Sequence, residues 1–322
     1  QQIGNKGSYI LTLPKNWCVE NNVRHGSELE LGLDQIKKGS VLITLPNHQS
    51  KQSKREVIIS FDDLVDQRMI GRSILGRYLN GYEIIKVTDI PEIKKLEVRK
   101  TIKALIQKLY VSRETDIVDN SIEIHVSSEL ISPITVIEDL FIKAQNMVID
   151  SVNAYFEGDV ELADDVILRD EDADKLYFYI VRTLKKILRD PLISSELFSR
   201  AEGSSFSIED SMDLRMIATY LENLADSAEM LAKTTLRVFE IPTSSKTNKE
   251  IIQIFTRLNR MLDRSFQSFT EEDQTKAIQI LDEVKERKKS NEIKLENSTP
   301  ALKNILNELT ECVIDIADLV GE

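Results

Sequence analysis

The pattern of apolar residues becomes helical at Ser132 and stays so to the end of the chain. Apolar side chains recur every three or four residues, as at Ile137 and Ala144 in one stretch and at Leu221 and Leu224 in another. Such spacing gives each helix one apolar face to bury against its neighbours. It predicts an all-α bundle at 131–322, with helices at 133–157, 159–189, 208–240, 247–268, 271–296 and 299–320.

The predicted helices read as two copies of a three-helix unit. The segment Asn146–Asp150 is echoed by Asn259–Asp263, and Leu221–Ala228 is echoed by Thr310–Ala317. Three helices alone bury their apolar faces poorly, and a second copy completes a shared core. The repeat therefore predicts one bundle made of two similar halves.

Residues 55–130 alternate between strand and helix patterns. Gly81 suits the end of a helix, and Pro91 suits the first turn of the next one. The pattern predicts a small α+β domain of the split βαβ kind. Its strands are expected at 57–61, 83–88, near Ile117 and at 121–126, with helices at 62–80 and 91–110.

The first 46 residues predict a small β module, with strands at 8–13, 28–33 and 41–45. A unit of this size buries too little apolar surface to be stable alone, so we expect it to pair with a second copy. Residues 47–54 are polar and aperiodic, which predicts a linker. The expected fold class is thus multidomain: a β module, a small α+β domain and an all-α bundle.

Charge differs sharply along the chain. The 322 residues include 42 Lys and Arg against 54 Asp and Glu, a formal net charge of −12. Acidic proteins are generally poor nucleic-acid binders, because phosphate contacts require cations. The balance is nevertheless +3 in residues 1–60, −1 in 61–130 and −14 in 131–322. Only the N-terminal module has a charge suited to DNA.

Other features narrow the possible protein classes. No apolar run reaches the length of about 18 residues that a membrane-spanning helix requires, and Cys18 and Cys312 form no metal or disulfide pattern. The N-terminus lacks a signal-peptide pattern, so we expect a cytoplasmic protein. His25, His48 and His125 all precede the bundle. No histidine is therefore available for a Glu-x-x-His di-iron site there.

Acidic residues four apart on the predicted helices are the main candidate chemistry. This spacing places both carboxylates on one helix face, where like charges cost about 0.2–0.5 kcal/mol. A hard cation with oxygen ligands, such as Mg²⁺, Mn²⁺, Ca²⁺ or iron, would offset that cost. A solvated acidic face is the alternative. The pairs are Asp170/Asp174, Glu222/Asp226 and, on a more polar face, Glu311/Asp315.

Two of these pairs lie in segments with a family resemblance. Ala163–Val166, Arg169–Leu176, Asp213–Arg215 and Glu222–Ala228 resemble the PhoU phosphate-uptake-regulator family. The resemblance implies two three-helix repeats, each with an acidic-x-x-x-Asp motif on its second and third helices. It also implies that these motifs bind multinuclear metal clusters.

The second repeat departs from this motif. The positions that match Asp170 and Asp174 are Lys288 and Glu292 if Val166 is aligned with Val284. A slip of two residues gives Glu286 and Ser290, which is also degenerate. We therefore expect the second repeat to bind metal weakly or not at all. Lys288 would instead be a counter-charge to Glu311 and Asp315.

The N-terminal segments Gly7–Trp17 and His25–Glu30 resemble the AbrB/SpoVT-type DNA-binding module. The resemblance implies a swapped-hairpin barrel made by two chains, and hence a homodimer. Lys6, Lys15 and Arg24 flank this unit and are the residues expected to face DNA phosphates. The order of the two modules is similar to that of archaeal phosphate-uptake regulators.

These patterns lead to a non-enzymatic regulator of phosphate uptake as the expected function. Its β module would bind operator DNA, and its bundle would sense a metal ion or phosphate status. The alternative is an adaptor that dimerises through the β module and docks on a phosphate transporter or signalling kinase without binding DNA. A carboxylate-metal phosphohydrolase is the third reading, but the sequence offers no evident nucleophile, base or arginine clamp.

Overall fold

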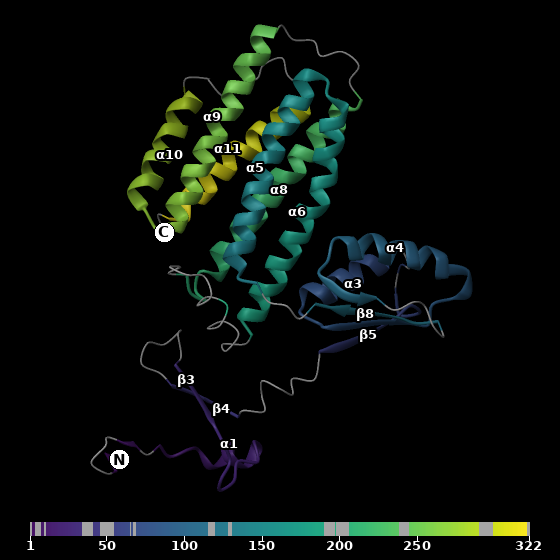
Figure 1. Ribbon diagram of the computed structural model, residues 1–322, viewed down its shortest axis with the longest axis vertical. Coiled ribbons are helices and arrows are strands. Elements are labelled where there is room, and N and C mark those ends of the chain that lie inside the picture. The colour runs from purple at the N-terminus through teal and green to yellow at the C-terminus, as the bar shows by residue number, and fades with distance from the viewer. Residues whose placement is uncertain are drawn as a thin grey trace. The chain divides into compact units, whose positions relative to one another are not determined.

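The computed structural model of the chain (Figure 1) divides into two compact units, Gln1–Ser53 and Lys54–Glu322. The residues described are 2–3, 8–9, 11–33, 41–45, 55–64, 66, 69–114, 120–127, 131–189, 197, 206–237, 245–289 and 299–320. The predicted linker at 47–54 lies outside them.

The N-terminal unit contains two short hairpins and one helix. Strand β1 (Gln2–Ile3) pairs antiparallel with β2 (Ser8–Tyr9). Helix α1 (Lys15–Glu20) follows in the sequence, and after it β3 (Glu30–Leu33) pairs antiparallel with β4 (Val41–Thr44). The strand expected at 8–13 ends at Tyr9, since residues 11–14 have no ladder partner. None of the described side chains in this unit is buried.

The exposure of these described side chains is consistent with the expected need for a second copy, because a small module must bury apolar surface somewhere to be stable. A swapped-hairpin barrel made by two chains is not shown by the single chain and stays a prediction. The same holds for the homodimer.

The α+β part of the second unit is a four-stranded sheet with the order β5-β6-β8-β7. Strands β5 and β6 are parallel, and the other neighbouring strands are antiparallel. The elements in chain order are β5 (Glu56–Ser60), α3 (Ile70–Leu79), β6 (Ile84–Thr88), the 3₁₀ turn η2 (Glu92–Lys94), α4 (Lys95–Gln107), β7 (Val111–Glu114) and β8 (Ile122–Val126).

Alternation along these strands places the core on one face of the sheet. Ile59, Val87 and Ile122 lie in one row across β5, β6 and β8, and they are buried with Ile74 of α3 and Ile102 of α4. Both helices therefore cover this face.

Several element boundaries differ from the expected ones. The first helix begins at Ile70 rather than at residue 62, because turn hydrogen bonds close residues 60–64 instead: Asp63 N–H donates to Ser60 and Leu64 N–H to Phe61. The second helix, expected to begin at Pro91, begins instead with the 3₁₀ turn η2, and α4 starts at Lys95. A strand follows at Val111–Glu114, whereas the one expected near Ile117 lies outside the described residues.

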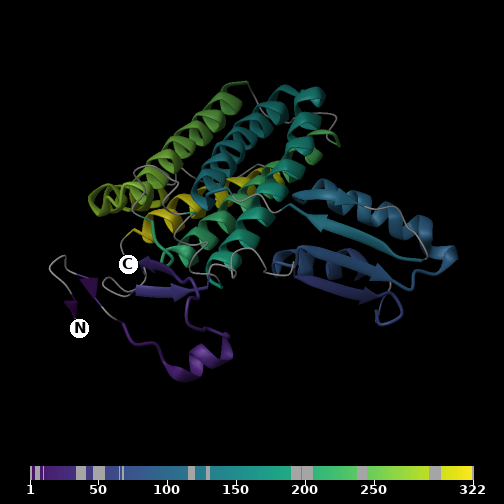
Figure 2. The same ribbon diagram turned by 60° about the horizontal axis from the view of Figure 1, so that its bottom comes forward.

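The bundle contains six helices among the described residues. Helices α5, α6 and α8 all contact one another, and α9, α10 and α11 do the same; α8 then packs on α11, and α5 on α9 (Figure 2). The bounds are α5 (Pro133–Glu157), α6 (Val160–Ile187), α8 (Ser211–Thr235), α9 (Ser245–Thr270), α10 (Gln274–Lys289) and α11 (Pro300–Asp318).

A single apolar cluster runs through both sets of helices. Phe141 of α5 and Phe266 of α9 stack across the boundary with ring centroids 4.1 Å apart. Ser265 of α9 donates a hydrogen bond of 2.9 Å to the carbonyl of Val313 in α11. No described helix has both the length and the apolar composition that crossing a bilayer requires.

The α+β part is attached to α6 through the carbonyl end of α3. Arg182 of α6 is buried and donates to the carbonyl oxygens of Tyr78 (2.5 Å) and Tyr82 (2.9 Å). Arg189 donates to the Asn80 carbonyl at 2.5 Å, and Arg55 donates to the same oxygen at 3.0 Å. Cations at the C-terminus of a helix satisfy its unpaired carbonyls and its dipole.

Candidate metal centre

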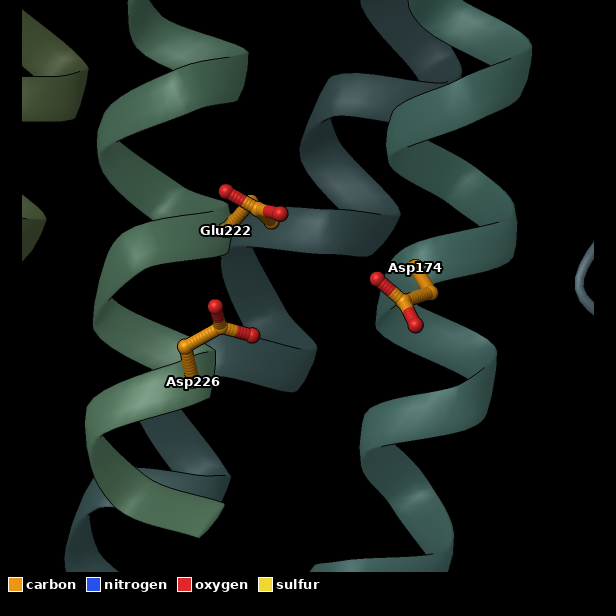
Figure 3. A group of neighbouring side chains, drawn as sticks. All are labelled: Asp174, Glu222 and Asp226. Carbon is orange, nitrogen blue, oxygen red and sulfur yellow. The ribbon is translucent and has the colours of Figure 1, made fainter. Parts of the chain in front are cut away.

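Carboxylates from α6 and α8 point toward one another in the first half of the bundle. Figure 3 shows Asp174 on α6 facing Glu222 and Asp226 on α8. One carboxylate oxygen from each of these residues can be chosen so that all three lie within 4.8 Å of one another. The structure thus brings together three of the residues singled out from the sequence.

Asp170 lies one helical turn before Asp174 and is the most buried acid of the group, with 8% of its surface exposed. It is outside the set of three, yet it is close enough to Asp174, Asp226 and Glu229 for their charges to act on it. Asp174 and Glu222 are half-buried, whereas Asp226 is exposed. The group therefore has a buried end at Asp170 and an open end at Asp226.

Burial and mutual repulsion weaken the acidity of these groups. The pKa of Asp170 is raised to about 7, first by burial and then by the charges of Glu229, Asp174 and Asp226. The pKa of Glu222 is also raised to about 7, by burial first and then by Asp226, Asp174 and Asp170. The pKa of Asp226 is raised for the same reasons. Near neutral pH the group is thus costly to ionise fully.

One cation from the α+β part reaches this group. Lys108, the residue that follows α4, forms an ion pair through Nζ with Oδ2 of Asp174. Burial lowers the pKa of Lys108, but the hydrogen bond and the charge of Asp174, with those of Asp170 and Glu171, raise it by more. Lys108 therefore stays protonated and offsets part of the negative charge.

The donor set fits a hard cation. The candidate ligands Asp174, Glu222 and Asp226, and Asp170 beside them, are all carboxylates. Among the described residues, no histidine or cysteine belongs to the group. Oxygen donors suit Mg²⁺, Mn²⁺, Ca²⁺ or iron, whereas structural zinc sites generally use sulfur and nitrogen.

The second half of the bundle has a different arrangement. Lys288 of α10 forms an ion pair with Glu311 of α11 at 2.9 Å, which is the contact expected from the sequence. Burial, followed by the charges of Glu311 and Asp318, raises the pKa of Asp315, and Lys288 opposes this rise. Burial and both Glu311 and Asp315 also raise the pKa of Glu308.

A repeated ion pair supports the alignment of the two halves. Arg169 pairs with Asp165 on α6 at 2.9 Å, and Arg287 pairs with Glu283 on α10 at 2.7 Å. Both pairs fall on matching positions when Val166 is aligned with Val284. The residue after each arginine is then Asp170 in the first half and Lys288 in the second. Glu292 and Ser290 lie outside the described residues.

The sequence did not identify Lys108 as part of this group. It is 66 residues away from Asp174 and belongs to a different part of the fold. No local spacing rule links such residues, since their contact depends on how α4 packs near α6. A single lysine at the end of a helix gives no other indication in the sequence that it pairs with a distant carboxylate.

The N-terminal candidates are only partly described. Lys15 is the first residue of α1, and both Lys15 and Arg24 are exposed. The Arg24 backbone N–H donates to Ser27 Oγ at 2.9 Å, which holds the turn before β3. Lys6 lies outside the described residues. DNA contact by these residues stays a prediction.

Comparison with known proteins identifies the region that carries the carboxylates. Neither the curated proteins nor the solved structures that were searched give a significant match to the chain. A family model described as the PhoU domain matches residues 137–235, which run from α5 through α6 to the end of α8. Asp170, Asp174, Glu222 and Asp226 therefore all lie within the segment that is similar to the PhoU domain.

Proposed function

We propose that the protein is a non-enzymatic regulator of phosphate uptake whose PhoU domain binds a hard cation between α6 and α8. The observation that supports this most directly is the convergence of Asp174, Glu222 and Asp226, with ligand oxygens within 4.8 Å of one another. It lies inside the matched PhoU segment. Such a convergence of like charges calls for a compensating positive charge.

Asp174, Glu222 and Asp226 would hold the ion, and Asp170 would stabilise it from the buried side. The bound ion would supply positive charge at which an anion such as phosphate can approach an otherwise acidic bundle. Protonation of Asp170 and Glu222 opposes cation binding, since a carboxyl must be ionised to be a ligand. The state of the site is therefore sensitive to cation concentration and to pH.

Equilibrium dialysis against Mn²⁺ tests this proposal. We expect the wild type to bind Mn²⁺ and the double variant Glu222→Gln/Asp226→Asn to lose that binding. The matched control is Asp164→Asn, which removes an exposed carboxylate from α6. Wild-type protein that takes up no Mn²⁺, or a double variant that binds as well as the control, would contradict the metal site.

The N-terminal unit supplies the second part of the proposal, which is binding to DNA as a homodimer. Residues 1–60 carry a net charge of +3, and two copies would double it. Lys15 and Arg24 are exposed, and with Lys6 they are the residues proposed to contact phosphates. Phosphate contacts imply an affinity that falls steeply as salt rises.

Fluorescence anisotropy with DNA from upstream of the protein's own gene tests this part. We expect binding at low salt that weakens in the variant Lys15→Glu/Arg24→Glu, with Glu20→Gln as a control on α1. Absence of binding by the wild type at low salt would exclude a DNA-binding regulator.

The alternative is an adaptor that docks on a phosphate transporter or signalling kinase without contacting DNA. The PhoU match is compatible with this alternative, because it lies in the bundle, from α5 to the end of α8. Pull-down of such partners by the full chain, combined with a negative anisotropy result, would select the adaptor. Strong salt-dependent DNA binding would select the regulator.

A further inference from the structure

Lys108 contacts the PhoU carboxylates from outside the matched PhoU segment. It belongs to the α+β part, at the C-terminal end of α4, and its ammonium group is paired with Asp174. The charges of Asp170 and Glu171 act on the same ammonium group. A cation that belongs to the chain therefore already lies at the group of carboxylates proposed to bind a metal.

The two residues that follow Lys108 are held by packing. Leu109 is buried in the core of the α+β part, with 2% of its surface exposed. Tyr110 packs its ring 4.8 Å from that of Tyr179 on α6, and the ammonium of Lys175 lies 4.8 Å above the same ring. The backbone position of Lys108 is thus set by its neighbours, while its long side chain is held by the ion pair with Asp174 and has other rotamers once that pair breaks.

Lys108 and a metal ion would compete for the negative charge of Asp174. An ammonium and a divalent cation repel each other at short range, and both gain from the carboxylate of Asp174. Asp174 cannot give full ligand strength to a metal while it accepts the hydrogen bond from Lys108. Lys108 pairs with Oδ2 of Asp174, so a metal bound through either oxygen would lie close to the ammonium group and be repelled by it, which favours displacement of the lysine.

We infer that Lys108 is the built-in counter-ion of this carboxylate group and limits its affinity for metal, so that metal loading releases a contact between the α+β part and α6. This inference rests on the proposed metal site. It assigns to the α+β part a role as the element that senses loading. The contacts of Arg182 with the Tyr78 and Tyr82 carbonyls keep the α+β part attached to α6 in both states.

Mn²⁺ affinity is the first test, measured by equilibrium dialysis on the full chain. Replacing Lys108→Met removes the competing charge and is expected to tighten Mn²⁺ binding about tenfold or more. Lys108→Arg keeps the charge and should stay near the wild type. The control is Lys103→Met, because Lys103 is exposed on the same helix and forms no ion pair with a described residue.

The outcomes separate this inference from the metal site itself. Equal Mn²⁺ affinity in the wild type and in Lys108→Met would overturn the inference and leave the metal site standing. Absence of Mn²⁺ binding in all of these proteins would overturn both.

Lysine acetylation followed by mass spectrometry gives a second readout that does not depend on a variant. Without metal, Lys108 is expected to react more slowly than Lys103, because its ammonium group is paired. Saturating Mn²⁺ should raise the rate at Lys108 several-fold and leave the rate at Lys103 unchanged. A constant rate at Lys108 while Mn²⁺ binds would overturn the inference.

Discussion

Arg182 on α6 holds the end of α3 through Tyr78. Its guanidinium donates to the Tyr78 carbonyl at 2.5 Å and lies 4.9 Å from the centroid of the Tyr78 ring. Both residues are buried. This contact uses the unpaired carbonyl end of a helix as a binding site for a cation from another part of the fold.

The change Arg182→Met should destabilise the protein and loosen α3. It leaves the carbonyls of Tyr78 and Tyr82 without their buried donor, at an expected cost of about 2–4 kcal/mol in the free energy of unfolding. Urea denaturation measures the cost, and hydrogen exchange should show faster exchange in α3.

Arg72→Met is the matched control for this prediction, because Arg72 is an exposed arginine on α3 itself. We expect it to change stability by less than about 0.5 kcal/mol. An effect as large as that of Arg182→Met would show that the cost comes from α3 and not from its attachment.

Two glycines should respond in opposite directions to replacement by alanine. Gly158 ends α5 with φ +67°, which an L-residue adopts only with strain. Gly158→Ala is therefore expected to lower stability by about 1 kcal/mol. Gly76 lies inside α3 with open space at its Cβ position, so Gly76→Ala should raise stability by about 0.5–1 kcal/mol. Thermal unfolding of both variants measures these changes. A change in stability of the same sign in both variants would contradict the prediction.

The sequence predicted α5 at its observed bounds because both ends carry strong local signals. Pro133 occupies the first turn, and Gly158 ends the helix in the left-handed conformation. The start of α3 was misplaced by eight residues, since Asp62 and Asp63 resemble a helix start. In the structure they lie in a turn that carries the chain from the sheet to its helical face.

The candidate site was predictable within each helix and less so between helices. The four-residue spacing of Asp170 and Asp174 fixes their common face, whatever the tertiary structure. Their approach to α8 depends on how the bundle packs, and the arrival of Lys108 depends on a third element. Long-range contacts of this kind are set by the whole core rather than by any local pattern.

Stability of the metal-free protein should fall as pH rises from about 5 to 8. The pKa values of Asp170 and Glu222 are about 7 in the folded state, against 3.8 and 4.5 as their ordinary values. The folded state thus holds protons that the unfolded chain has released. That stabilisation is complete below the unfolded pKa values and is lost as pH rises through 7.

With allowance for screening by solvent, the fall should amount to roughly 1–3 kcal/mol in the free energy of unfolding. Urea titrations at several pH values in the presence of a chelator measure it. The variant Asp170→Asn/Glu222→Gln cannot lose these protons, so its profile should be flatter over the same range. A variant profile as steep as that of the wild type would assign the pH dependence to other groups.

Addition of Mn²⁺ at pH 8 should restore stability if the proposed site exists, because the ion would then bind the ionised carboxylates only in the folded state. At a free concentration of about 100 times its Kd, the gain is about 2.7 kcal/mol. At pH 5 the gain should be smaller, since protons compete with the ion for Asp170 and Glu222. Equal gains at both pH values would place the bound ion away from these carboxylates.

Replacing Lys288→Asp should create a second metal site in the other half of the bundle. Lys288 pairs with Glu311 at 2.9 Å and stands at the position that matches Asp170. The change removes the counter-charge and adds a carboxylate four residues before Glu292, as in the first half. Without metal it should cost about 1 kcal/mol through repulsion.

Mn²⁺ dialysis should then show a higher stoichiometry for this variant than for the wild type. Lys285→Asp is the control, because Lys285 is exposed on the same helix and only approaches Asp282 at 4.0 Å. If Lys288→Asp leaves the stoichiometry unchanged, the loss of one carboxylate is not what distinguishes the two halves. The difference would then lie in exposure, because Glu311 is exposed whereas Asp170 is buried, and burial strengthens the attraction of a carboxylate to a cation.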